Sequence, residues 1–311
     1  MRLIEKLPEI WKYADSFITH FMIPEDRKQS MRNDIFQNQL REIINNDIMN
    51  KNPDDLFDEY KEYFSCKRLP LKIIESNTVF YRGRIGNDMI RGAEDDWNKS
   101  FIIPYHQNEI EAPPPLYATG GRFNREGVSY LYLASSIETC LAEVHLSIGQ
   151  YCSIGEFECQ KKMSVIDLTK FHADIELQTW HDILMQPVYS DTKYVYNKTR
   201  FIADVLKNIN RNGIYFESVQ TTGCNIVCFD HSLFKLKQYS EKIYTATKIK
   251  YDYIQVEDAI REYAKNGKRK YINSYNSDEE EKNDKILDYL NDWIKNEEHT
   301  SLQNNDEIIQ S

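Results

Sequence analysis

Five short blocks in the middle of the chain hold the side chains that are able to do chemistry. They are YRGR at residues 81–84, GGRFN at 120–124, YLYLA at 130–134, CLAEVH at 140–145, and ESV with GCNIVCF between 217 and 229. The chain has no phosphate-binding glycine loop of the usual types, no HExxH motif and no GxSxG motif, so the commonest site signatures are absent. What remains is a set of carboxylate, guanidinium and hydroxyl groups.

Glu143 is the carboxylate of this set. It follows Cys140 by one helical turn and leaves from the edge of a buried stripe, so it needs a cationic partner or a ligand. Arg122 is the natural candidate for that partner. The alternative is a purely structural salt bridge at a helix edge, which is the commoner role of such pairs.

The aromatic and hydroxyl groups also have two interpretations each. Alternation in YLYLA places Tyr130 and Tyr132 on one face of a strand, where Tyr132 either packs in the core or stacks on a ligand ring. Ser218 ends a strand before the turn VQTTG, so it either caps that turn or hydrogen-bonds a phosphate or ribose. It is not a convincing nucleophile, because no block beside it contains a histidine, and we expect His145 to point into solvent or to pack structurally.

These blocks, in this order, resemble the RES-domain family. The resemblance also includes the segments APPP, VIDL, YNKTRFIA and GIYFES and covers about half of the chain, from Asn77 to Phe234. The Arg, Glu and Ser that give the family its name correspond to Arg122, Glu143 and Ser218. Further matches fall on Arg82 and Tyr132, and we expect Asn124 and Asn225 in the same blocks to bind substrate as well.

The resemblance implies both a fold and a reaction. The fold is α+β, with a split and highly curved β-sheet like that of ADP-ribosyltransferases and a cleft for NAD+. The implied activity is degradation of NAD+ by a toxin or phage-defence effector, often held in check by an antitoxin. NAD+ is then a substrate, and the chain requires no metal and no resident cofactor.

The chemistry of NAD+ suits these residues. Its nicotinamide is already a cationic leaving group, so cleavage at the ribose needs stabilisation of an oxocarbenium-like transition state. We expect Glu143 to supply that charge, while Arg82 and Arg122 hold pyrophosphate or inorganic phosphate. With phosphate as acceptor and co-substrate, the products are nicotinamide and ADP-ribose-1″-phosphate; with water, ADP-ribose replaces the latter. A protein ADP-ribosyltransferase and a non-catalytic NAD+-sensing or partner-binding module remain alternatives.

Hydrophobic periodicity predicts the elements that position these residues. The expected strands are Thr78–Tyr81, Tyr130–Ala134, Ser153–Cys159, Val165–Leu168, Ile214–Glu217 and Asn225–Phe229. One helix is expected from Ser135 to about Ile148, capped by Ser135 with Glu138, and a second from Thr199 to Asn210. We therefore predict an N-terminal helical domain at 1–75, the RES domain at 76–238, and a helical, acidic extension at 239–311.

Composition limits the remaining possibilities. The formal net charge of -10 argues against binding to nucleic acid, and the basic run at 265–270 is more simply a solvated stretch. None of the six cysteines forms a CxxC pair, so we expect buried thiols. No apolar run is long enough for a membrane span, which favours a cytoplasmic protein.

The flanking regions are departures from minimal RES toxins. The N-terminal region faintly resembles HEPN-type domains, but it has no Arg followed within a few residues by His, so ribonuclease activity is not expected. The flanks are candidates for regulating the enzyme, for contacting an antitoxin or for forming a homo-oligomer.

Overall fold

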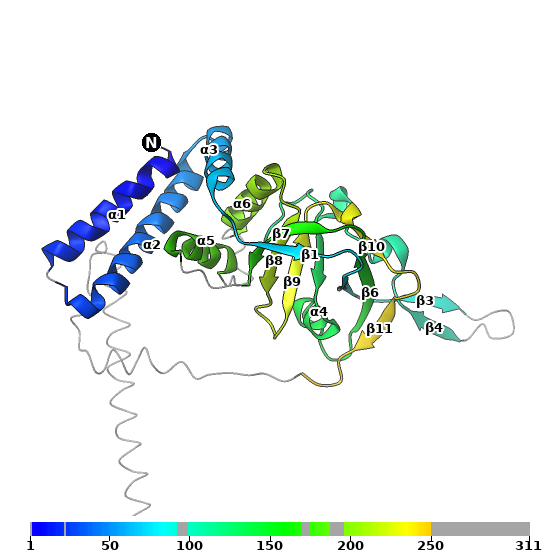
Figure 1. The fold of residues 1–311 in the computed structure, drawn as a ribbon. Coiled ribbons are helices and arrows are strands. Elements are labelled where there is room, and N and C mark those ends of the chain that lie inside the picture. The colour runs from blue at the N-terminus through cyan, green and yellow to red at the C-terminus, as the bar shows by residue number, and fades with distance from the viewer. Residues whose placement is uncertain (1, 22, 92–98, 170–173, 187–195, 250–311) are drawn as a thin grey trace, which may run out of the picture. The chain divides into compact units, whose positions relative to one another are not determined.

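The computed structural model describes residues 2–21, 23–91, 99–169, 174–186 and 196–249 (Figure 1). The chain divides into two units, Met1–Ile249 and Lys250–Ser311, and every described residue belongs to the first. Residues 250–311 of the predicted helical, acidic extension therefore lie outside the described residues. No helix in the described ranges is both long and apolar enough to cross a membrane.

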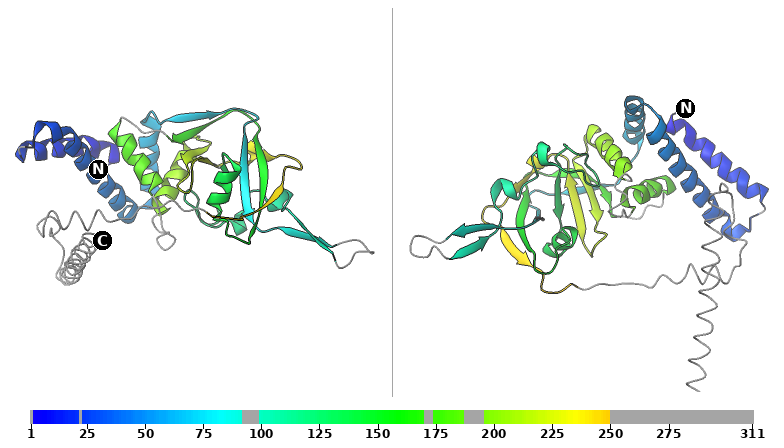
Figure 2. Two further views of the ribbon diagram at one scale, coloured as in Figure 1. Left: turned by 90° about the horizontal axis from the view of Figure 1, so that it is seen from below. Right: turned by 180° about the vertical axis from the view of Figure 1, so that it is seen from behind.

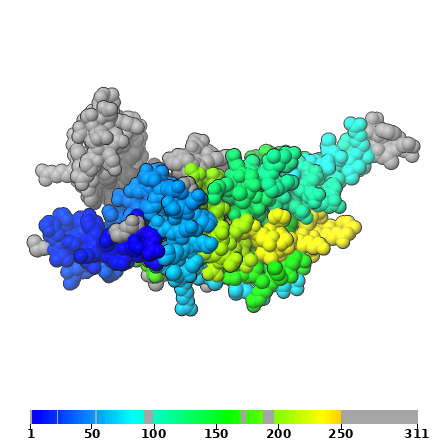
Figure 3. Space-filling model, turned by 90° about the horizontal axis from the view of Figure 1, so that it is seen from above, coloured from blue at the N-terminus to red at the C-terminus, as the bar shows by residue number. Residues whose placement is uncertain are grey.

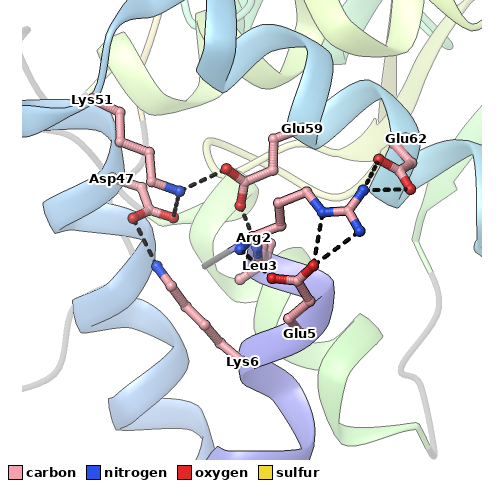
Figure 4. A network of polar contacts seen from close by, with 8 residues as sticks. All are labelled: Arg2, Leu3, Glu5, Lys6, Asp47, Lys51, Glu59 and Glu62. Atoms are coloured by element: carbon pink, nitrogen blue, oxygen red, sulfur yellow. Dashed lines mark hydrogen bonds and ion pairs between the residues drawn. The ribbon is translucent and has the colours of Figure 1, made fainter.

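Three helices form the N-terminal region, as their apolar periodicity predicts: α1 (Leu3–His20), α2 (Glu25–Asn50) and α3 (Pro53–Cys66). A polar network joins them around the buried carboxylate of Asp47 (Figure 4). Its two oxygens contact Lys6 Nζ and Lys51 Nζ, each at 3.1 Å, and Lys51 also reaches Glu59 of α3 at 2.6 Å. Positive and negative groups alternate in this network, so each buried charge has a partner of opposite sign. The ion pairs connect α1 to α2 through Asp47, and they reach α3 through Lys51 and Glu59.

A sheet of nine strands forms the centre of the unit, in the order β1-β7-β8-β9-β5-β2-β6-β10, with β11 also paired to β6. These strands are β1 (Leu71–Ile74), β2 (Val79–Ile85), β5 (Leu131–Ala134), β6 (Tyr151–Cys159), β7 (Met163–Leu168), β8 (Gly213–Glu217), β9 (Cys224–Cys228), β10 (Phe234–Leu236) and β11 (Lys242–Thr245). All pairings are antiparallel except that of β7 with β8. The α+β class expected from the sequence is confirmed.

The sheet is split between β5 and β2. These strands share one register pair, Tyr81 with Ala134, whereas β2 and β6 pair along seven positions. Two halves therefore diverge on either side of this point, and the views in Figures 1 and 2 show the curvature that results. A cleft needs such a divergence, because a continuous flat sheet leaves no room between neighbouring strands.

Alternation along the strands places two apolar layers on opposite faces of the sheet. Tyr132 of β5 and Tyr130 directly before it face one core, while Leu131 and Leu133 face the other. The helices α5 (Ile175–Met185) and α6 (Tyr196–Asn208) cover the first face. The short helix α4 (Ile137–Glu143) packs instead over the split, against Ala134 of β5 and Cys152 of β6.

The N-terminal helices share the first core with α5 and α6. Trp180 of α5 donates its indole N–H to Tyr63 Oη of α3 at 2.7 Å, and both side chains are buried. Phe57 and Tyr60 pack edge-on against Phe201 of α6. The side chains of α1–α3 and those of the sheet region accordingly form one continuous surface in Figure 3.

The strands predicted from the sequence are all present, with ends that agree or are shifted by up to four residues. The sequence analysis did not predict helix α5 or the strands β1, β10 and β11. It also did not predict the separate hairpin of β3 (Asp88–Arg91) and β4 (Ser100–Ile103). The helical character expected directly after Gln238 is wrong up to residue 249, because Lys242–Thr245 pairs with β6.

Candidate active site

A cavity of about 610 Å³ opens at the split of the sheet. Five of the seven site residues predicted from the sequence line it: Arg82, Arg122, Tyr132, Glu143 and Asn225. They come from β2, the loop before β5, β5 itself, α4 and β9. Ser218 and Asn124 are absent from the lining, although each contacts a residue that belongs to it.

The end of α4 fixes the position of Glu143. Ser136 begins the helix by accepting a hydrogen bond from the backbone N–H of Thr139, at 3.1 Å. The predicted cap at Ser135 is wrong, because its Oγ accepts from Cys224 N of β9 instead. The predicted continuation to Ile148 is also wrong: the helix ends at Glu143, and His145 adopts a left-handed φ of 54°.

Two neutral donors hold the Glu143 carboxylate. Ser218 Oγ and Asn225 Nδ2 both donate to Oε1, each at 2.7 Å. Oε2 accepts no hydrogen bond from the described residues. Since a carboxylate at a helix C-terminus meets the negative end of the helix dipole, these two donors supply stabilisation that the helix does not.

Ser218 caps the turn, as one of its two predicted roles requires, and it also donates to Glu143, a contact that the sequence did not predict. Its oxygen accepts from the backbone N–H groups of Gln220 at 3.1 Å and Thr221 at 3.3 Å, which caps the turn after β8. Its single proton goes to Glu143. The Ser218 hydroxyl is therefore a hydrogen-bond donor to the Glu143 carboxylate.

Arg122 does not pair with Glu143, so the expected ion pair is wrong. Its Nη1 donates to the carbonyl oxygens of Leu184 at 3.1 Å and Gln186 at 2.9 Å, where α5 ends. The guanidinium carbon lies 5.2 Å from the centre of the Tyr196 ring. Nε and Nη2 have no hydrogen bond within the described ranges, so that side of the guanidinium can bind an anion.

Arg82 is held more deeply. Nε donates to Ile110 O at 2.9 Å and Nη1 to Tyr132 O at 3.3 Å, which leaves Nη2 unused among the described contacts. Burial lowers the pKa of Arg82, and the neighbouring Arg84 lowers it further. An anion in the cavity would offset both effects.

Tyr132 and Asn124 form the support of the GGRFN loop. Tyr132 Oη donates to Asn124 Oδ1 at 2.9 Å and accepts from Phe123 N at 3.1 Å. The buried Asn124 amide donates to the carbonyls of Thr119 and Val128, each at 2.9 Å. Gly121 must be glycine here, since a Cβ would lie 2.6 Å from Asn124 Oδ1. Asn124 thus positions the loop that carries Arg122, and its amide has no free donor facing the cavity.

Some residues that line the cavity were not predicted from the sequence. Tyr196 and Phe216 lie in the segments YNKTRFIA and GIYFES but were not predicted as site residues, and no motif includes Met185 of α5. His145 is exposed, as expected, but it also lines the cavity. Cys140 lines it too, and burial raises the pKa of this thiol to about 12, so it is neutral at physiological pH.

Comparison with known proteins bears directly on this site. Residues 102–251 match the family model of the RES domain, a range that contains every predicted site residue except Arg82. The resemblance inferred from the sequence is thereby confirmed.

A search of solved structures gives a fainter similarity, to a chain in the crystal structure of the M. tuberculosis MbcT–MbcA toxin–antitoxin complex. The two chains are 14% identical, with a TM-score of 0.36, over 56% of this chain and 87% of that one. No curated protein matches the sequence.

Proposed function

From a chain that carries a RES domain, with a carboxylate and two arginines around one cavity, we propose an enzyme that cleaves the nicotinamide–ribose bond of NAD+. The observation that carries this proposal is the state of Glu143. Two neutral donors fix one oxygen, and among the described residues no cation pairs with the carboxylate and no donor reaches the other oxygen. An unneutralised carboxylate suits a substrate that develops positive charge in its transition state.

The acceptor that we propose is inorganic phosphate. A phosphate oxygen forms a bond to the ribose carbon as the bond to nicotinamide breaks, and the electron pair of that bond leaves with nicotinamide. The pyridinium nitrogen becomes neutral, so no general acid is needed. The products are nicotinamide and ADP-ribose-1″-phosphate.

The arginines would hold the anionic groups. Arg122 presents Nε and Nη2 as a planar fork that fits two phosphate oxygens, and Arg82 offers Nη2 from the floor of the cavity. Tyr132 would contact the substrate only through its ring, because its hydroxyl already donates to Asn124. Ser218 and Asn225 would keep Glu143 oriented, and Asn124 would act through the loop.

Two alternatives use the same cavity. A protein ADP-ribosyltransferase would transfer ADP-ribose to an amino-acid side chain, and hydrolysis would transfer it to water. An NAD+-sensing module would bind the dinucleotide without turnover.

The biological role that we propose is that of a toxin or defence effector in the cytoplasm. An active NAD+-consuming enzyme would stop the growth of its own host, so an antitoxin or another regulator must restrain it. The N-terminal helices or a homo-oligomer could provide this restraint.

The test is product analysis by mass spectrometry. Purified protein incubated with NAD+ and phosphate should release nicotinamide together with ADP-ribose-1″-phosphate, and chloride in place of phosphate should suppress the phosphorylated product. Glu143→Gln should bind NAD+ but lose turnover, whereas the matched change Glu138→Gln, at an exposed position of the same helix, should retain it. ADP-ribose as the product in either buffer would establish hydrolysis instead.

A further inference from the structure

A second cavity, of about 570 Å³, lies beside the candidate active site. Helix α2 contributes Arg41 and Asn45 to its wall, α5 contributes Asp182 and Met185, and α6 contributes Lys198. Met185 lines both cavities, so the two are direct neighbours. We call this space the α2–α5–α6 cavity.

The charges of this cavity do not cancel. Arg41 Nη2 and Asp182 Oδ2 form an ion pair at 3.1 Å, which neutralises the only carboxylate among the described residues of the wall. Lys198 Nζ has neither a hydrogen bond nor an ion pair within the described part of the chain. The cavity therefore holds an excess of positive charge in a protein whose formal net charge is -10, and a local cation of this kind attracts an anion at short range.

The surroundings of Lys198 point the same way. It lies in the first turn of α6, which contains no acidic residue, and the N-terminal end of a helix favours negative charge. Burial lowers the pKa of the Lys198 ammonium, a cost that a bound anion would offset.

Hydrogen-bond donors complete the site. Arg41 retains Nε and Nη1, because only its Nη2 is used in the described contacts. Asn45 lies one turn further along the same face of α2 and makes no hydrogen bond through its amide among the described residues. Guanidinium, ammonium and amide donors from two helices can together satisfy several oxygens of one anion.

We propose that the α2–α5–α6 cavity binds the phosphate group of an anionic ligand, either free phosphate or a phosphate carried by a nucleotide. This site goes beyond the proposed reaction, since none of Arg41, Asn45 and Lys198 lines the active-site cavity. It would nevertheless influence that cavity, because the end of α5 lines both spaces and its carbonyls hold Arg122. Its ligand would thus connect the N-terminal helices to the catalytic region.

The direct test is protection of Lys198 from acetylation, quantified for each lysine by peptide mass spectrometry on the full chain. The reaction is run at constant ionic strength in sodium chloride, in inorganic phosphate and with added ADP-ribose. We expect phosphate or ADP-ribose to slow acetylation of Lys198 at least about threefold by occupying the site. Lys61, exposed on α3, is the internal control and should react at one rate throughout.

Variants connect the protection to the proposed contacts. Arg41→Gln should abolish it, and so should Asn45→Asp, which adds a negative charge without removing the Arg41–Asp182 pair. Protection by both compounds would show that the phosphate group suffices, and protection by ADP-ribose alone would identify a nucleotide-borne phosphate. Equal reaction of Lys198 in all three buffers, or full protection in Arg41→Gln, would overturn the proposal.

The outcome is independent of catalysis. Nicotinamide release is measured in parallel with wild-type protein and NAD+, and an inactive protein can still show protection of Lys198. Failure of the second site and failure of the proposed reaction are therefore distinguishable.

Discussion

Glu143 and Ser218 lie 75 residues apart in the chain, and the hydroxyl of one donates to the carboxylate of the other at 2.7 Å. The contact joins the C-terminal end of α4 to the end of β8. Asn225 of β9 donates to the same carboxylate oxygen at the same distance. One oxygen of Glu143 thus accepts both hydrogen bonds, whereas the other accepts none from the described residues.

Ser218→Ala should reduce kcat for nicotinamide release by about 10-fold to 100-fold, the effect of losing one hydrogen bond to a charged group, of about 1.5–3 kcal/mol. KM for NAD+ should change less, because Ser218 acts through Glu143. Ser76→Ala, at an exposed position outside the site, is the control. An unchanged kcat would show that Asn225 alone orients the carboxylate.

Arg122→Lys should lower kcat/KM at least about tenfold, or roughly 1.4 kcal/mol, although it keeps the charge. An ammonium cannot both hold the two carbonyls at the end of α5 and present a planar fork to the cavity. The stimulation of the rate by phosphate should disappear as well. Arg125→Lys, in the same loop but paired with Asp204, is the matched control. Wild-type kinetics in Arg122→Lys would rule out the phosphorolysis that we propose.

Cys140 should resist alkylation although it lines the cavity. Its pKa is raised to about 12 by burial, so at pH 8 the reactive thiolate is roughly one ten-thousandth of the population. Iodoacetamide should modify the exposed Cys66 first, as measured by peptide mass spectrometry. The rate at Cys140 should rise as the pH approaches its raised pKa, as long as the chain stays folded. Rapid modification at pH 8 would exclude a buried neutral thiol.

Much of the sheet was predictable because its two faces are buried in different cores. Alternation in YLYLA correctly separated Tyr130 and Tyr132 from Leu131 and Leu133, since a strand repeats every two residues. The edge strands β10 and β11 are three and four residues long, too short to carry a period. Helix α5 was missed because its buried face includes Gln178 and Thr179, whose polar side chains interrupt an apolar stripe.

The site was predictable as a set of residues but not as a set of contacts. The prediction placed Glu143 at the edge of a buried helical stripe with Arg122 as its partner, but α4 ends at Glu143, and the carboxylate accepts from Ser218 and Asn225 instead. Arg122 is held by the carbonyls of α5, a helix that the pattern did not reveal. Contacts of this kind depend on where helices end, which is the least determined feature of a sequence.

Tyr132→Phe tests the support beneath the arginine loop. The change removes the hydroxyl that donates to Asn124 and accepts from Phe123 N, so a buried donor and a buried acceptor each lose a partner. We expect the free energy of unfolding to fall by about 1–3 kcal/mol in urea denaturation, and KM to rise as the loop carrying Arg122 loosens. Tyr130→Phe, directly before β5 and facing the same core, is the matched control, because its hydroxyl makes one long contact with Asp204, at 3.4 Å. That variant should lie within about 0.5 kcal/mol of wild type and keep its KM. Equal stability of the two variants would show that the loop is held by its backbone and by Asn124 alone.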